Sequence, residues 1–104
     1  MNDAALIKRC QSGDETAFDE LIRIYYPYVH GFLIKATANE TLADDLTQDT
    51  FLKMICSIES FNSDGRAGFG TWLITIAKNK FIDHLRRNKI VLQDIDSVDI
   101  ADPQ

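Results

Sequence analysis

The sequence predicts an all-α protein, a compact bundle of about four helices. The chain has only two prolines and five glycines among 104 residues, so little interrupts a helix. Apolar residues recur three and four positions apart, the spacing that forms one face of a helix, whereas strand-like alternation is hard to find before residue 90. A hydrophobic content of 45% can build one modest core, which indicates one domain.

A short first helix is expected over residues 3–11 and is ended by Ser12-Gly13. Asp14 has the side chain of an N-cap, and from it a second helix is expected to run to about residue 38. Pro27 lies in the middle of this helix and predicts a kink or a break just before it. The expected buried face carries Phe18, Leu21, Ile22, Tyr25, Val29, Phe32 and Ala36.

The third helix is expected to begin at Asn39 or Thr41 and to end at about Ile58. Thr41 and Asp44 have the spacing of a capping box in which aspartate replaces glutamate. A helical wheel places Ala43, Phe51, Met54, Ile55 and Ile58 on a buried face, and Asp45, Gln48, Asp49 and Leu52 on the opposite one. The second face suggests a docking surface for a basic partner helix, but a solvated face with one exposed leucine fits equally well.

A turn-rich segment, residues 59–70, predicts a loop before the last helix. The fourth helix is expected over residues 71–89, with polar and cationic side chains along one stripe. This stripe consists of Thr71, Thr75, Lys78, Asn79, Ile82, Arg86 and Lys89. The loop and the start of the helix place Phe61, Arg66, Phe69 and Trp72 beside it.

Charge is distributed unevenly along the chain, whose net charge is −5. Residues 1–65 carry five basic and eleven acidic side chains, residues 66–89 six basic and one acidic, and residues 90–104 four aspartates and no cation. Salt screens charges beyond about 8 Å, so the basic segment can attract phosphate locally. Cations beside aromatic rings bind unpaired bases. The alternatives are a solvated stripe and aromatic side chains that close the core.

Several classes of protein are excluded by what the sequence lacks. No segment approaches the roughly 20 apolar residues of a membrane span, and the amino terminus lacks the layout of a secretion signal, so a cytoplasmic protein without membrane insertion is expected. Cys10 and Cys56 are expected to be reduced structural thiols. His30 and His84 form no metal motif, and no phosphate-binding loop is present. We therefore expect no enzyme, no cofactor and no metal.

Residues 4–89 together resemble region 2 of bacterial sigma factors, in particular the small extracytoplasmic-function (ECF) group. GDETAFDELIRIYYPYVHGFL, residues 13–33, is similar to the opening helices of that group. DDLTQDTFLK, residues 44–53, looks like the segment that docks on the clamp helices of the largest RNA polymerase subunit. SFNSDGRAGFGTWLITIAKNKFIDHLRR, residues 60–87, resembles the stretch that opens and reads the minus-ten promoter element. The order and spacing of DLxQ and TWLxxIAxN make the match specific.

The resemblance implies a non-catalytic region 2 domain over residues 1–89, with core RNA polymerase and promoter DNA as partners. The DNA would be mainly the single-stranded non-template minus-ten element, from which the loop and Asn79 capture a flipped base. Expected polymerase contacts are Asp45, Leu46, Gln48, Asp49 and Leu52. Expected DNA contacts are Phe61, Asn62, Ser63, Asp64, Gly65, Arg66, Phe69, Trp72, Thr75, Lys78, Asn79, Arg86 and Lys89. An anti-sigma factor is a further expected partner.

The chain departs from the family in its loop and in its length. The loop after Phe61 is slightly longer than the usual Arg-Gly-Asp/Glu-Ser type, so the base preference does not transfer. Family members continue into a second helical domain that reads the minus-35 element, and residues 90–104 are expected to be an acidic linker toward that absent domain. A rival hypothesis is a helical module that binds polymerase or an anti-sigma factor without reading DNA.

Overall fold

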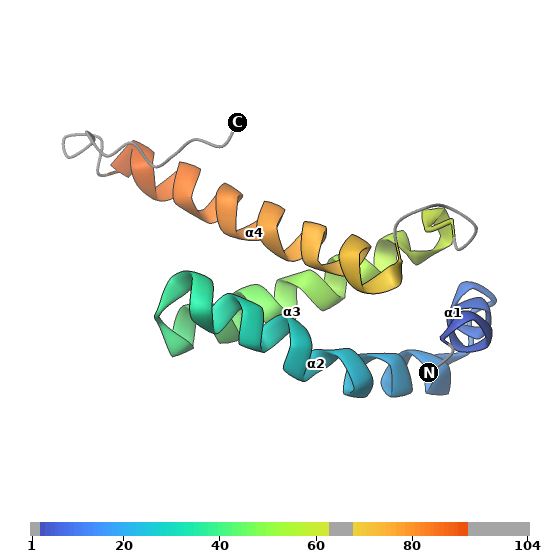
Figure 1. Ribbon diagram of the computed structural model, residues 1–104. Helices are drawn as coiled ribbons and strands as arrows, with labels where there is room; N and C mark the ends of the chain where they lie inside the picture. Colours follow the sequence, from blue (N-terminus) through green and yellow to red (C-terminus); the bar gives the residue numbers. More distant parts are fainter. Residues whose placement is uncertain (1–2, 63–67, 92–104) are drawn as a thin grey trace.

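The computed structural model describes residues 3–62 and 68–91, which form an all-α bundle (Figure 1). The elements are α1 (Ala4–Gln11), α2 (Glu15–Thr37), α3 (Glu40–Ser57), the 3-10 turn η1 (Ile58–Ser60) and α4 (Phe69–Val91). The predicted fold class is confirmed. Within the described ranges no helix combines the length and the apolar character that crossing a bilayer requires. The predicted linker lies outside the described residues, apart from the end of α4.

The helices α2 and α3 run antiparallel and side by side, and α4 lies over them, while α1 crosses the beginning of α2 (Figure 1). The first half of α4 packs on the bundle and buries Phe69, Leu73 and Ala77. After Ala77 the described side chains of α4 are exposed or half-buried. The C-terminal half of α4 therefore presents most of its surface to solvent.

Asp14 links α1 to α2 and is the N-cap that the sequence predicts. Its Oδ1 accepts hydrogen bonds from the backbone N–H groups of Thr16 at 3.0 Å and Ala17 at 3.3 Å. Its Oδ2 accepts a bond from Arg9 Nε at 3.0 Å. The bonds from Thr16 and Ala17 satisfy backbone N–H groups that have no partner within the helix. Gly13, just before it, has a φ of +93°, a conformation that glycine adopts without strain.

Helix α2 continues through Pro27 to Thr37, so the predicted break does not occur. Figure 1 shows that the axis of α2 changes direction near its middle, as the alternative of a kink predicts. Proline removes one backbone hydrogen bond, and the bonds on either side suffice to hold the helix together. Ala38, the residue after Thr37, is the C-cap of the helix and has a left-handed φ of 55°.

The start of α3 differs in detail from the predicted capping box. Asn39 is the N-cap, and its side chain accepts a hydrogen bond from Leu42 N at 3.0 Å. Thr41 lies inside the helix. Asp44 is 2.7 Å from His30 on α2 instead of capping its own helix. The capping-box prediction is therefore wrong, because an interaction between helices takes the carboxylate.

The core takes apolar residues from each helix and from η1, namely Ile7, Cys10, Ala17, Leu21, Val29, Leu33, Ala43, Leu46, Phe51, Met54, Ile58, Phe61, Phe69, Leu73 and Ala77. Burial of each leucine contributes about 1.5 to 3 kcal/mol. Thr47 and Thr50 of α3 are also buried. Their hydroxyls donate to the carbonyls of Ala43 and Leu46, each at 2.7 Å, so neither of these two buried hydroxyls lacks a partner.

Two details of the predicted core are wrong. Ala36 is exposed in the last turn of α2, and Leu33 takes its place as a fully buried residue. Ile55 is 40% exposed because it faces the edge between α2 and α3. Cys10 and Cys56 are both free thiols, of which Cys10 is buried and Cys56 is exposed.

Asp14 is expected to make the stability of the fold depend on pH in the acidic range. The bonds from Thr16 and Arg9 hold its pKa at about 2, below the ordinary 3.8. Because the folded chain binds this proton less readily, the stabilisation is present above pH about 4 and is lost as the pH falls through about 2. We expect the stability difference between wild type and Asp14→Ala, measured by urea denaturation, to shrink below pH about 4. A difference that stays constant down to pH about 2.5 would contradict this role.

Candidate nucleic-acid interface and docking groove

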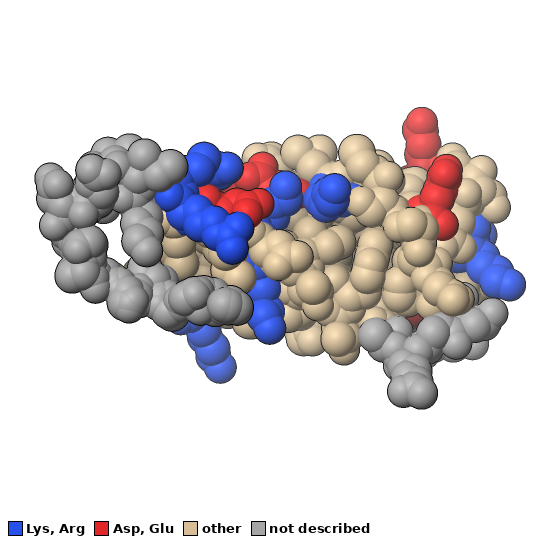
Figure 2. All heavy atoms as spheres, turned by 90° about the horizontal axis from the view of Figure 1, so that it is seen from above, with Lys and Arg blue, Asp and Glu red and all other residues tan. Residues whose placement is uncertain are grey.

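The stripe of polar and cationic side chains predicted over residues 71–89, called the α4 stripe from here on, lies on the surface of the protein. Thr71, Thr75, Lys78, Asn79 and Arg86 are exposed, and Ile82 is half-buried. Figure 2, which looks onto the α4 side, shows Lys and Arg side chains gathered over the C-terminal part of this helix, with acidic residues among them. The side chain of Lys89 lies outside the described residues. The stripe is therefore open to a ligand along more than two turns.

The cations of α4 make no ion pair within the described ranges. The salt bridges found there join Arg9 to Asp14 and His30 to Asp44, and both lie away from α4. Lys78, Arg86 and Arg87 are exposed. Because no carboxylate of the described ranges is paired with these charges, they can bind phosphate groups.

Aromatic side chains pack at the start of α4 and form what we call the aromatic cluster: Tyr25, Phe61, Phe69 and Trp72. The ring centroids of Phe61 and Phe69 are 5.4 Å apart, and Trp72 lies 5.1 Å from Phe61. Tyr25 meets the edge of Phe69 at 5.1 Å. Such edge-to-face contacts favour aromatic packing beyond simple burial. The cluster joins the end of η1 to the beginning of α4.

Burial in this cluster corrects part of the predicted DNA interface. Phe61 is 9% exposed and Phe69 is 5% exposed, so neither ring has a free face for a base. The alternative that they close the core is right for these two. Trp72 is half-buried and keeps part of its surface open. Asn62 and Gly68 are exposed, while the predicted contacts Ser63, Asp64, Gly65 and Arg66 lie outside the described residues.

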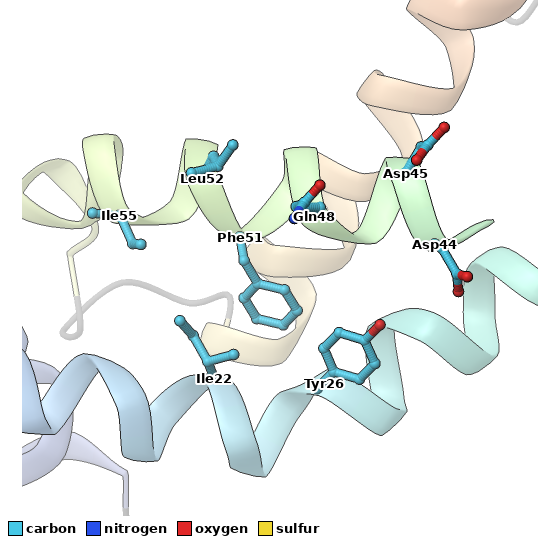
Figure 3. A pocket seen from close by; sticks show the side chains of 8 residues that line it. All are labelled: Ile22, Tyr26, Asp44, Asp45, Gln48, Phe51, Leu52 and Ile55. Carbon is cyan, nitrogen blue, oxygen red and sulfur yellow. The ribbon is translucent and has the colours of Figure 1, made fainter. Parts of the chain in front are cut away.

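A groove with a volume of about 470 Å³ runs between α2 and α3 (Figure 3). It is lined by Ile22 and Tyr26 of α2 and by Asp44, Asp45, Gln48, Phe51, Leu52 and Ile55 of α3. Figure 3 shows Phe51 pointing between the helices, whereas Leu52 and Asp45 point away from α2. The groove is apolar near Leu52 and Ile55 and acidic near Asp44 and Asp45.

Stacked rings and one contact between His30 and Asp44 fix the wall of this groove. Tyr26 lies parallel to Phe51 at 6.0 Å between centroids and to His30 at 5.4 Å. The Nε2 atom of His30 is 2.7 Å from Asp44 Oδ1. These interactions connect α2 with α3 along the groove, so its shape is set before a partner arrives.

The predicted polymerase contacts lie beside this groove, with one exception. Asp45, Gln48 and Leu52 line it, and Asp49 is exposed nearby on α3. Leu46 is only 3% exposed and belongs to the core, so its predicted role in docking is wrong. The sequence predicts Ile22 on the buried face of the second helix and assigns no role to Tyr26, so it does not reveal that both line the groove. Both belong to α2, whereas the docking segment is predicted on α3 alone.

Comparisons with known proteins bear on both surfaces. The model of the family described as sigma-70 region 2 matches residues 21–90. The ECF sigma factor BldN of Streptomyces coelicolor is 35% identical over 88 residues, which are 85% of this chain and 33% of BldN. The ECF sigma-E factor of Haemophilus influenzae is 38% identical over 85 residues, 82% of this chain and 43% of that protein. The chain thus spans less than half the length of these relatives.

A solved structure has the same fold. It is the NMR structure of an engineered region 2 of sigma E in complex with GTAAAA. The TM-score is 0.75 at 29% sequence identity, and the match covers 84% of this chain and 88% of that one. The arrangement of the helices is therefore shared with a protein that was solved in complex with GTAAAA.

Neighbouring groove residues should respond differently to truncation. Phe51 is 6% exposed, so Phe51→Ala should lower the free energy of unfolding by about 3 to 5 kcal/mol. Leu52 is 58% exposed, so Leu52→Ala should change it by no more than about 0.5 kcal/mol. Urea denaturation of both variants measures this. A large effect of Leu52→Ala would mean that this side chain holds the fold and is not a free surface group.

Proposed function

This chain belongs to the sigma-70 region 2 family, within its ECF group, and we propose that it docks on core RNA polymerase and recognises and melts the minus-ten element of a promoter. The observation that carries the proposal is the α4 stripe, whose exposed cations have no acidic partner within the described residues. The helix dipole favours the cation of Arg86 near the end of α4, but it gives no comparable stabilisation to Lys78 in the middle of the helix. A polyanionic ligand would pair its phosphate groups with the exposed cations of α4.

The DNA half of the proposal assigns different tasks to groups on α4. Lys78 and Arg86 hold phosphates, and Lys89 is expected to join them. Asn79 and Thr75 offer an amide and a hydroxyl to base edges, and the open part of Trp72 offers a stacking surface. Phe61 and Phe69 support the site from within the core instead of touching bases. The complex of the structural neighbour with GTAAAA supports binding of a short nucleotide sequence by this fold.

Melting in this proposal is driven by capture of unpaired bases. Taking a base out of the duplex costs a few kcal/mol in stacking and pairing. Each base stacked on an aromatic side chain contributes about 1 to 3 kcal/mol of binding free energy, which offsets this cost, and phosphate contacts contribute further. Residues 62–66, with Asn79, are the proposed place for a flipped base. No covalent step is involved, so the domain would act by binding alone.

The polymerase half assigns the groove between α2 and α3 to the clamp helices of the largest subunit. Leu52, Ile55 and Tyr26 are exposed apolar groups of the kind found at the centre of interfaces. Asp45 and Asp49 would face basic residues of the partner and fix its orientation. An anti-sigma factor that competes with polymerase would cover the same surface.

The DNA half can be tested with a double variant. Lys78→Ala with Arg86→Ala removes two proposed phosphate-binding side chains, so the log of the affinity for a single-stranded non-template minus-ten oligonucleotide should fall less steeply with the log of salt concentration. The slope should decrease by about 0.7 for each phosphate that is no longer neutralised. Fluorescence anisotropy titrations at several salt concentrations measure this.

The matched control is Lys8→Ala with Lys53→Ala, which removes the same charge from exposed positions of α1 and α3. The control should keep the wild-type slope. If both double variants behave alike, the α4 stripe is not the binding surface. If wild type binds no oligonucleotide at all, the chain is a protein-binding module and the DNA half is wrong.

The polymerase half predicts the effect of a charge reversal. Asp45→Arg places a cation where a basic partner helix would lie, and like charges cost several kcal/mol, so binding to core RNA polymerase should weaken at least about tenfold. Glu20→Arg, on an exposed part of α2 outside the groove, is the control and should bind as wild type does. Gel filtration and titration against labelled core polymerase measure both. An undiminished complex with Asp45→Arg argues against this groove.

A further inference from the structure

Gln11, the last residue of α1, makes an interaction that neither proposed surface includes. Its Nε2 donates to the carbonyl of Ile58 at 2.8 Å and to the carbonyl of Phe61 at 2.9 Å. Both hydrogens of the amide are thus engaged by residues more than forty positions away in the chain. The two bonds are partly buried, which increases their strength compared with exposed bonds.

These carbonyls belong to the first residue of η1 and to Phe61, the residue that follows η1. The backbone N–H of Phe61 also donates to the carbonyl of Ile58, at 3.0 Å. Gln11 therefore fixes the backbone carbonyls of Ile58 and Phe61, and this backbone sets the position of the Phe61 ring. That ring packs against Phe69 and Trp72 in the aromatic cluster.

A second interaction from the start of α1 reaches the same cluster from the other side. The Tyr25 hydroxyl donates to a carboxylate oxygen of Asp3, which precedes α1. The ring of Tyr25 meets Phe69, the first residue of α4. Ile7 and Cys10 of α1 are buried between these two ends of the helix. The short helix and its N-cap residue thus touch both flanks of the cluster.

We propose that Gln11 is a positioning residue for DNA binding, acting through the aromatic cluster. By fixing Phe61, it holds Trp72 and the neighbouring Asn62 in place relative to the α4 stripe. A site whose parts are already held loses less conformational freedom when a ligand binds. The inference rests on the proposed DNA-binding function. It also extends the working unit to α1, because Gln11 precedes the residues 21–90 matched by the family model.

The test replaces Gln11 with methionine, which has similar length and no hydrogen-bond donor. Trp72 is the only tryptophan in the chain, so its fluorescence reports on the cluster without a label. We expect Gln11→Met to shift the Trp72 emission and to make it easier to quench with acrylamide. Binding of a single-stranded DNA oligonucleotide containing GTAAAA should weaken by roughly threefold to tenfold, the scale of ordering one side chain.

Further measurements separate positioning from simple loss of stability. The salt dependence of binding should stay as in wild type, because the phosphate-binding side chains of α4 are intact. Ile7→Val, a mild truncation of a buried residue on the same helix, is the control and should change neither Trp72 emission nor affinity. Gln11→Glu, which also lacks the donors, serves as a second variant. Circular dichroism confirms that each variant is folded at the titration temperature.

The outcomes distinguish this inference from the proposed function. Unchanged Trp72 emission, or unchanged affinity in folded Gln11→Met and Gln11→Glu, overturns the positioning role. A similar loss of affinity in Ile7→Val also overturns it, since any weakening of α1 would then suffice. If wild-type protein binds no DNA, the proposed function fails and the positioning role fails with it, while a Trp72 shift still supports the link between Gln11 and the cluster.

Discussion

The packing of Phe61 against Phe69 brings the end of η1 next to the first turn of α4, and other features of the molecule depend on that packing. It fixes the point from which α4 starts, and hence which side of the helix is buried through Leu73 and Ala77. Since the side chains of a helix turn by a constant angle, the buried side also determines where Lys78 and Arg86 point. The polar surface of α4 is thus set by an apolar contact at its beginning.

The central position of α3 explains how the domain carries two surfaces without conflict. This helix packs against both α2 and α4 and buries Leu46, Thr47 and Thr50. Its remaining side faces solvent along the groove, where Asp45 and Leu52 lie, whereas the polar stripe belongs to another helix. A partner in the groove and a ligand on α4 would therefore use different residues, as the proposed binding of both polymerase and DNA requires.

Local signals in the sequence predicted much of the fold, and interactions between helices account for the misses. Asp14 caps α2 because that interaction involves only its own neighbours. The capping role predicted for Asp44 is wrong because His30, far away in the chain, takes its carboxylate. The likeness to a family indicated the segments that we propose to carry function, but it did not tell which side chains point inward. It therefore included Leu46, Phe61 and Phe69 among the expected contacts, although they are buried. The groove is formed by two helices at once and could not be predicted from either alone.

The uneven charge of the chain has a consequence for how an encounter begins. Most of the protein is acidic, and the excess of cations is confined to residues 66–89. A nucleic acid that approaches from elsewhere is repelled, while one that approaches α4 is attracted. Because salt screens charges beyond about 8 Å, this preference acts at short range, where it favours approaches that bring the last helix toward a polyanion. The acidic remainder of the surface would disfavour the unproductive contacts that a uniformly basic domain forms on every side.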